Sequence, residues 1–168
     1  MPVPLTSREM TETSPPYSTA PSYHGDRTWD VIIRSSLSAP ADKVWAALRN
    51  FHDLSTFPNV IENVDIVGDT AGTQIGAQRV LNGAFHETLL ALDDNARVIR
   101  YSIDDGPEAL AKDSVSGYVG EVQVFPVTDD DASFVLWTSS WDDSNGGVAE
   151  FCNPIYQALL GDLKASLS

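Results

Sequence analysis

The chain has 168 residues, 42% of them hydrophobic and 20% charged, which is the composition of a globular protein with one sizeable core. Its 24 acidic and 10 basic residues give a net charge of -14, and a field of that sign repels phosphate backbones and anionic lipids. We therefore expect neither a nucleic acid nor a membrane as partner, and no apolar run is long enough to predict a membrane-spanning helix.

Residues 1–27 are rich in Pro, Ser and Thr and have almost no aliphatic periodicity. This composition is typical of a disordered leader, with a targeting or partner motif as the alternative. The segment has no basic stretch followed by an apolar one, so no secretory signal is expected. Cys152 is the only cysteine, which excludes an intrachain disulfide and favours a reducing, cytoplasmic location. One folded domain is predicted over residues 28–168.

The first predicted elements are a strand and two short helices. Alternating apolar residues from Trp29 onward indicate the strand. Ser38 and Pro40 then begin a helix over "ADKVWAALRNF", whose apolar side chains recur at helical spacing. The stretch "DLSTFPNVI" is predicted to form a second short helix that stops near Pro58.

The rest of the chain is predicted to be strands followed by one helix. The runs rich in β-branched and aromatic residues are "NVDIVGD", "AQRVLN", "AFHETLLALD", "RVIRYSIDD", "SVSGYVGEVQVFPV" and "SFVLWTSSWDD". Short polar gaps, including a two-residue turn at Asn82-Gly83, require hairpins and hence an antiparallel meander. The closing helical pattern is interrupted at Pro154, so this helix either kinks there or begins only at Asn153.

This order of elements predicts an α+β fold. We expect a seven-stranded curved antiparallel sheet wrapped around a long C-terminal helix, with two short helices after the first strand. One helix cannot fill a wide concave sheet, so a cavity between the helix and the sheet is expected. Polar side chains that face inward would then contact a ligand.

Two ionisable residues, Arg79 and Glu87, stand among apolar residues on either side of the predicted turn. If Glu87 faces inward, Phe85, Leu89 and Ala91 share its face, and loss of hydration raises its pKa. Such a carboxyl acts as a general acid or base near neutral pH, or accepts a hydrogen bond from a ligand hydroxyl. The alternative is that Arg79 and Glu87 form an internal ion pair that fixes the strand register.

Other candidates for the cavity wall lie on neighbouring strands. Tyr101 and Tyr118 carry hydroxyls that donate a hydrogen bond or a proton, with core packing as the alternative for each. Trp137, Ser139 and Trp141 share one face of a strand. Paired indoles at this spacing suit a flat aromatic ligand and equally suit ordinary core packing.

Four further residues are assigned from their positions in the predicted elements. Ile155 and Leu159 belong to the apolar face of the last helix, and Cys152 on the same face is interpreted as a buried structural cysteine. Glu62 is either a pocket acid or a solvated strand end. No metal is expected because the histidines are scattered, and the missing phosphate-binding and dinucleotide motifs predict no cofactor of those kinds.

The segments "SSLSAPADKVWAALRNFHDLSTFPNVI", "GAQRVLNGAFHETLLALDDNARVIRYSI" and "FVLWTSSW" together resemble the helix-grip superfamily. That superfamily holds the START domains, the birch-pollen-allergen proteins and the polyketide cyclase/dehydrase-like (SRPBCC) proteins. The resemblance covers roughly residues 29–168 and implies a helix-grip fold. Plant abscisic-acid receptors are similar in the same block, which implies cavity positions for Glu87 and Tyr118. It also places Glu62 where those receptors hold the ligand carboxylate with a lysine, and the acid here argues against that ligand.

Two functions remain open at the level of sequence. The first is a cofactor-free enzyme of small-molecule (secondary) metabolism that binds a hydrophobic polyketide-like or aromatic intermediate and promotes its cyclisation or dehydration. Glu87, Tyr118 and Arg79 are its predicted catalytic residues. The second is a non-catalytic carrier or sensor of a small hydrophobic ligand. The resemblance and the charged residues near the cavity favour the enzyme, and the oligomeric state stays open between monomer and homodimer.

Overall fold

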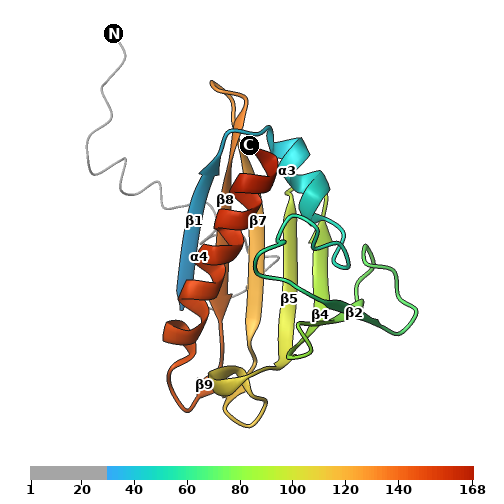
Figure 1. The fold of residues 1–168 in the computed structure, drawn as a ribbon, viewed down its shortest axis with the longest axis vertical. Coiled ribbons are helices and arrows are strands. Elements are labelled where there is room, and N and C mark those ends of the chain that lie inside the picture. Colours follow the sequence, from blue (N-terminus) through green and yellow to red (C-terminus); the bar gives the residue numbers. More distant parts are fainter. Residues whose placement is uncertain (1–29) are drawn as a thin grey trace.

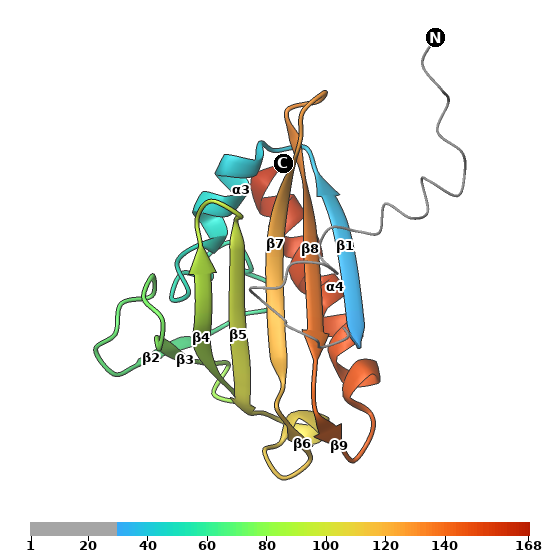
Figure 2. The ribbon, with the colours of Figure 1, turned by 180° about the vertical axis from the view of Figure 1, so that it is seen from behind.

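The computed structural model describes residues 30–168, so the predicted leader over residues 1–27 lies outside the described residues. The described chain is a seven-stranded antiparallel sheet in the order β1-β8-β7-β5-β4-β3-β2, shown from both sides in Figures 1 and 2. The strands of this sheet are β1 Val31–Leu37, β2 Val64–Val67, β3 Gln78–Leu81, β4 Phe85–Asp93, β5 Val98–Asp105, β7 Val119–Val127 and β8 Ala132–Ser140. The strand number, the antiparallel pairing and the helix-grip arrangement confirm the predicted fold class.

Two α-helices lie on one face of the sheet, which we call the inner face (Figure 1). Helix α4, Val148–Leu167, runs along the strands and packs against β1, and helix α3, Ala41–Leu48, lies at one end against β7 and β8. The core forms between these helices and the inner side chains of the strands. Helix α4 begins at Val148, so Pro154 lies inside it, and of the two alternatives the start at Asn153 is wrong.

The prediction of a second short helix over "DLSTFPNVI" is wrong, because residues 51–60 form successive turns instead. The Phe57 amide donates to the Leu54 carbonyl at 3.0 Å, and the Ile61 amide donates to the Phe57 carbonyl at 2.9 Å. Two local features interrupt a helical ladder here. Pro58 has no amide hydrogen to donate, and the Asp53 side chain accepts from the Ser55 amide at 3.0 Å in place of a backbone carbonyl.

The last two predicted strands are each shorter than expected. Gly117, with φ 63°, separates β6 (Val115–Ser116) from β7, and β6 pairs with β9 (Asp143–Ser144) in a small second sheet. Between β5 and β6 lies the 3₁₀ helix η2, Glu108–Leu110. Glycine adopts the left-handed backbone conformation of residue 117 readily, which lets the chain turn out of the main sheet at this point.

The hairpin of β3 and β4 places the two ionisable residues opposite each other. Arg79 pairs with Glu87 and Leu81 with Phe85, so the connection has three residues rather than the predicted two. Asn82 and Gly83 have φ values of 53° and 64°, a conformation that Asn and Gly tolerate best.

The pairing of β4 with β5 then fixes which side chains of β4 face inward. Glu87 pairs with Ile103 and Leu89 with Tyr101, all on the inner face. A register shift between Leu89 and Ala91 places Ala91 opposite Arg100 instead. The predicted inward position of Ala91 is therefore wrong, because the irregularity moves it to the outer face.

Candidate functional site

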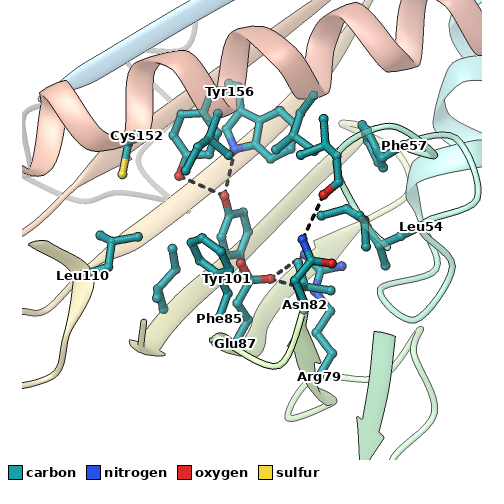
Figure 3. A pocket seen from close by; sticks show the side chains of 17 residues that line it. Leu54, Phe57, Arg79, Asn82, Phe85, Glu87, Tyr101, Leu110, Cys152 and Tyr156 are labelled. Atoms are coloured by element: carbon teal, nitrogen blue, oxygen red, sulfur yellow. Dashed lines mark hydrogen bonds and ion pairs between the residues drawn. The ribbon is translucent and has the colours of Figure 1, made fainter. Parts of the chain in front are cut away.

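A cavity of about 250 Å³ lies between α4, the inner face of the sheet and the turns at residues 54–61 (Figure 3). Its wall is mainly aliphatic and aromatic. The lining residues are Leu54, Phe57, Val60, Ile61, Arg79, Leu81, Asn82, Phe85, Glu87, Tyr101, Ile103, Leu110, Trp137, Cys152, Ile155, Tyr156 and Leu159. A mostly apolar cavity with a few convergent polar groups is typical of small-molecule binding sites.

The charged part of the wall is an ion pair between Arg79 and Glu87, which are only 8% and 6% exposed. Arg79 Nε lies 2.7 Å from Glu87 Oε2, and Nη2 lies 2.6 Å from the same oxygen. Its Nη1 donates to the Phe51 carbonyl at 2.6 Å, and the guanidinium lies 3.7 Å above the centre of the Phe51 ring. All three guanidinium nitrogens therefore have partners in the protein, and two of them hold one oxygen of Glu87.

The second oxygen of the Glu87 carboxylate, Oε1, accepts no hydrogen bond from any residue between 30 and 168. Burial raises the pKa of Glu87 above its ordinary value, because desolvation outweighs the opposing attraction and hydrogen bonding of Arg79. The carboxyl thus has one oxygen fixed by an arginine and one oxygen available to a molecule in the cavity. That arrangement suits a hydrogen bond from a ligand or a proton transfer.

A row of hydroxyls forms the wall beside Glu87. Trp137 Nε1 donates to the Tyr101 hydroxyl at 2.9 Å, and that hydroxyl lies 3.2 Å from the hydroxyl of Tyr156 (Figure 3). Tyr156 contacts the hydroxyl of Tyr118, which donates to Cys152 Sγ at 3.5 Å. Because each hydroxyl carries one proton, Tyr156 donates to Tyr118 and Tyr101 donates to Tyr156. Desolvation raises the pKa of each of these tyrosines well above its ordinary value, so all three are neutral.

The structure brings seven of the predicted site residues into the cavity wall. They are Arg79, Phe85, Glu87, Tyr101, Trp137, Ile155 and Leu159. The Arg79–Glu87 ion pair, offered as the alternative interpretation, is present together with the inward orientation of Glu87, so both descriptions hold at once.

The other five predicted residues are not among those that line the cavity. Glu62 is exposed just before β2, which is an edge strand of the sheet, and its backbone amide donates to Asn82 Oδ1 at 2.8 Å. Of the two alternatives stated from the sequence, a pocket acid or a solvated strand end, Glu62 is the solvated strand end. Leu89 faces inward but is completely covered by core side chains at 0% exposure.

Tyr118, Ser139 and Trp141 lie behind the wall, just before β7, on β8 and just after β8. The Tyr118 hydroxyl is separated from Tyr101 by that of Tyr156, so it reaches the cavity only through this neighbour. Trp141 stacks on the Tyr118 ring, with 6.0 Å between the ring centres, and Ser139 is fully buried. The three residues pack the layer that supports the aromatic wall.

Several lining residues were not predicted from the sequence. Tyr156 stands four residues after Cys152 on the apolar face of α4, and this spacing was a usable signal. Leu54 and Phe57 were assigned to a short helix without a role, although their spacing turns both side chains to one side. Nothing in the sequence marks Asn82 as a lining residue, because its position follows from how the β3–β4 turn folds back toward Val60.

Within the described part of the chain, no three His, Cys, Asp or Glu side chains come together as metal ligands do. None of the helices in residues 30–168 has the length and apolar character needed to span a bilayer.

Comparisons with known proteins place the protein that holds this cavity in a family. The profile described as "Polyketide cyclase / dehydrase and lipid transport" matches residues 29–168. A solved structure of a protein from Nitrosospira multiformis is 39% identical with a TM-score of 0.80, covering 82% of this chain and 95% of that one. The ginseng major latex-like protein 151 from Panax ginseng is 15% identical with a TM-score of 0.65, covering 82% of this chain and 95% of that one.

A third structure, from Thermobifida fusca, is 23% identical with a TM-score of 0.59 and covers 80% of this chain and 83% of that one. A comparison with curated proteins finds no match. The chain belongs to the polyketide cyclase/dehydrase and lipid transport family, and the likeness to the ginseng protein shows that it has the same fold. It is therefore a ligand-binding protein of the SRPBCC type.

Proposed function

We propose that this protein binds a small, uncharged, hydrophobic or aromatic molecule carrying a hydroxyl or enolisable carbonyl group, and that it promotes cyclisation or dehydration of that molecule without a cofactor. Glu87 is the proposed acid–base residue, with Arg79 as its positioning partner. The observation that carries this proposal is the free Oε1 atom of a buried carboxylate in an otherwise apolar cavity.

The size of the cavity supports a ligand of one or two rings. Its volume is about 250 Å³, which lies between the roughly 150 Å³ of an engineered cavity that holds benzene and the about 300–1,000 Å³ of drug-sized pockets. Aromatic wall residues favour a flat molecule. Tyr101 and Trp137 present ring surface and already satisfy each other's polar atoms, so a ligand can contact them without losing a hydrogen bond.

The charges of the cavity support a ligand that is neutral. A ligand carboxylate would meet the Glu87 carboxylate, while three of the five N–H groups of Arg79 are already directed at Glu87 or Phe51. A ligand hydroxyl instead supplies the hydrogen bond that Oε1 lacks. The same oxygen accepts a proton from a carbon next to a ligand carbonyl, which is the step that begins an aldol-type ring closure or a dehydration.

A carrier or sensor is the alternative, and one observation favours it. Two nitrogens of Arg79 contact the same oxygen of Glu87, and an ion pair with a purely structural role has this arrangement too. In that case the apolar cavity sequesters a ligand, and the wall hydroxyls only satisfy one another.

Binding is tested with naphthalene and 2-naphthol, which differ by one hydroxyl. We expect the wild-type protein to bind 2-naphthol about tenfold more tightly, because a hydrogen bond to a buried charged group is worth roughly 1.5 kcal/mol or more. In Glu87→Gln the amide oxygen turns to Arg79 and the NH₂ group faces the cavity, where it can only donate to the ligand hydroxyl as a neutral group. We therefore expect this preference to become clearly smaller, because the charge-assisted hydrogen bond is gone, while naphthalene binding stays unchanged. Fluorescence titration at several pH values measures both affinities.

Glu62→Gln is the matched control, because it removes the same charge from an exposed residue outside the wall. Equal affinities of wild type and Glu87→Gln for 2-naphthol would rule out the proposed role of Oε1. Native mass spectrometry of the protein from its own host then identifies the natural ligand. Conversion of that ligand by wild type but not by Glu87→Gln supports the enzyme, whereas release of the ligand unchanged by both supports the carrier.

A further inference from the structure

One side of the cavity wall has neither helix nor sheet. The segment 54–63, which we call the turn wall, supplies the lining residues Leu54, Phe57, Val60 and Ile61. The opposing walls are α4 and the strands, whose backbone amides are held in the hydrogen bonds of the helix and of the sheet. The turn wall has only short local turns of its own, and side chains from two other elements hold it in place.

Asn82, in the β3–β4 turn, is the first of these holding residues. Its Oδ1 accepts from the amides of Glu62 at 2.8 Å and Asn63 at 3.1 Å. Its Nδ2 donates to the Val60 carbonyl at 2.9 Å, which is the dashed line from Asn82 in Figure 3. Its backbone amide also donates to the Asn63 carbonyl at 2.9 Å. A single residue thus makes four hydrogen bonds to the last part of the turn wall.

Asp162, on α4, is the second holding residue and is only 7% exposed. Its Oδ2 accepts from the amides of Asn59 at 2.8 Å and Val60 at 3.1 Å, and its Oδ1 accepts from Asn59 Nδ2 at 2.8 Å. Both carboxylate oxygens are therefore directed at the turn wall. A buried acid that makes these contacts is well placed to hold this segment against the helix.

These contacts have a consequence for motion. The amides of Asn59, Glu62 and Asn63 donate to side chains of Asp162 and Asn82 rather than to a backbone ladder. Breaking these side-chain bonds removes hydrogen bonds from the segment and leaves those of the sheet and α4 in place, so that the packing of Phe57 against Trp137 is what remains to hold it. Segments with few backbone hydrogen bonds open at lower free energy than the strands beside them.

We propose that Asn82 and Asp162 are positioning residues that hold the turn wall closed, and that ligand enters and leaves the cavity when this wall opens. This inference rests on the proposed ligand-binding function of the cavity. It adds the route of exchange and the two residues that control its rate.

The first test uses amide hydrogen exchange on the unmodified full chain. We expect the amides of Asn59, Glu62 and Asn63 to exchange through a local opening with little denaturant dependence, faster than amides of β4 and β5. The rate constant for 2-naphthol dissociation then cannot exceed the opening rate of this segment measured under opening-limited conditions. Dissociation faster than that opening would overturn the proposal without any variant.

The second test removes each holding side chain. Asn82→Gly keeps the positive φ without strain and loses the amide group, and Asp162→Ala loses the carboxylate. We expect each variant to accelerate both association and dissociation of 2-naphthol about tenfold, with a smaller change in the dissociation constant. The reason is that the ligand passes the same opened wall when it enters and when it leaves. Asp162→Asn keeps an oxygen for the two amides and should restore rates close to those of wild type.

Asp94→Ala is the matched control for these variants. Asp94 also accepts three hydrogen bonds, from Trp45 Nε1 at 2.8 Å and from Arg49 at 2.8 and 3.1 Å, but none of these residues lines the cavity. Unchanged exchange rates in Asp94→Ala and raised rates in the two wall variants support the proposal. Equal changes in all three would show a general loss of stability and contradict it.

The two proposals fail in different ways. If no probe binds, the ligand-binding function is wrong, and the hydrogen exchange of the three amides still shows whether Asn82 and Asp162 hold the segment. If 2-naphthol binds but its rates are unaffected by both wall variants, the cavity function stands and the exchange route is wrong.

Discussion

Two buried glutamates on opposite faces of the sheet show what makes an acid part of a site. Glu87 on β4 faces inward and Glu121 on β7 faces outward, and they are 6% and 2% exposed. Desolvation raises the pKa of both carboxyls, to about 7 for Glu121. They differ in what surrounds them: Glu87 has Arg79 at hydrogen-bond distance, whereas Glu121 Oε2 has no hydrogen-bond partner among residues 30–168.

A raised pKa alone therefore does not identify a functional acid. Glu121 does not line the cavity. Desolvation raises the pKa of its carboxyl, and the charge of Arg100, its paired residue on β5, lowers that pKa by a smaller amount. Glu87 combines three features: an arginine that orients it, an oxygen left free, and a cavity that brings a ligand to that oxygen. Geometry separates the candidate site from a second buried acid with similar electrostatics.

The largest expected effect comes from removing the arginine. Arg79→Ala leaves the Glu87 carboxylate buried without a cation, and it leaves the Phe51 carbonyl without its donor. We expect a loss of about 3–5 kcal/mol in the free energy of unfolding at pH 8, measured by urea denaturation. The loss should shrink toward pH 4, where the carboxyl takes up a proton and no longer needs the pair.

The double variant Arg79→Leu/Glu87→Leu is the control for that change, because it removes both charges and fills the space with apolar atoms. It should recover a large part of the lost stability. A loss below about 1 kcal/mol for Arg79→Ala would show that the pair is not buried as described, and the contrast with Glu121 would disappear.

Replacing Glu121 is expected to change the free energy of unfolding by a smaller amount, and this change depends on pH. The folded-state pKa of about 7 exceeds the unfolded value near 4.5, so the folded protein binds more protons between these two values. Stability from this group is therefore complete below pH 4.5 and is lost as the pH rises through 7. Glu121→Gln should raise the free energy of unfolding at pH 8 by up to about 3 kcal/mol and flatten its decline between pH 4.5 and 7.

Thermal or urea unfolding across pH 4–8 measures this change. Glu62→Gln provides the comparison for an exposed acid and should shift stability by no more than about 0.5 kcal/mol. If Glu121→Gln destabilises the protein at pH 8, then the Glu121 charge is satisfied in the folded state, and the two glutamates are more alike than their surroundings indicate.

The smallest expected effect concerns neutral polar groups on the two faces. Tyr156→Phe removes the hydroxyl that joins Tyr101 to Tyr118 and should cost about 1–2 kcal/mol, because both neighbours lose a partner. Ser140→Ala on the outer face removes a buried hydroxyl that has no hydrogen-bond partner in the described range, so it should be neutral or slightly stabilising. Urea denaturation at pH 7 measures both, and equal effects of the two variants would contradict the described hydroxyl row.

Parts of the site were predictable because they depend on local order. The turn between two apolar runs predicted a hairpin, and alternation within β4 predicted that Glu87 shares its face with Phe85. The alternation failed at Ala91, because a register shift has no signal in the hydrophobic pattern. The helix predicted at "DLSTFPNVI" failed for a related reason: its apolar spacing is helical, but Pro58 and Asp53 favour turns that only tertiary contacts fix in place.

The sequence by itself determined the number of strands in the main sheet, their antiparallel pairing, the closing helix and the presence of ionisable groups in an apolar setting. Periodicity and turn chemistry act over a few residues, so they are readable without a structure. The tertiary structure alone decided which oxygen of Glu87 is free, that Tyr118 stands behind Tyr156, and that Asp162 holds a segment 103 positions away at Asn59. Contacts of this kind depend on the packing of elements distant in the chain, and no local pattern encodes them.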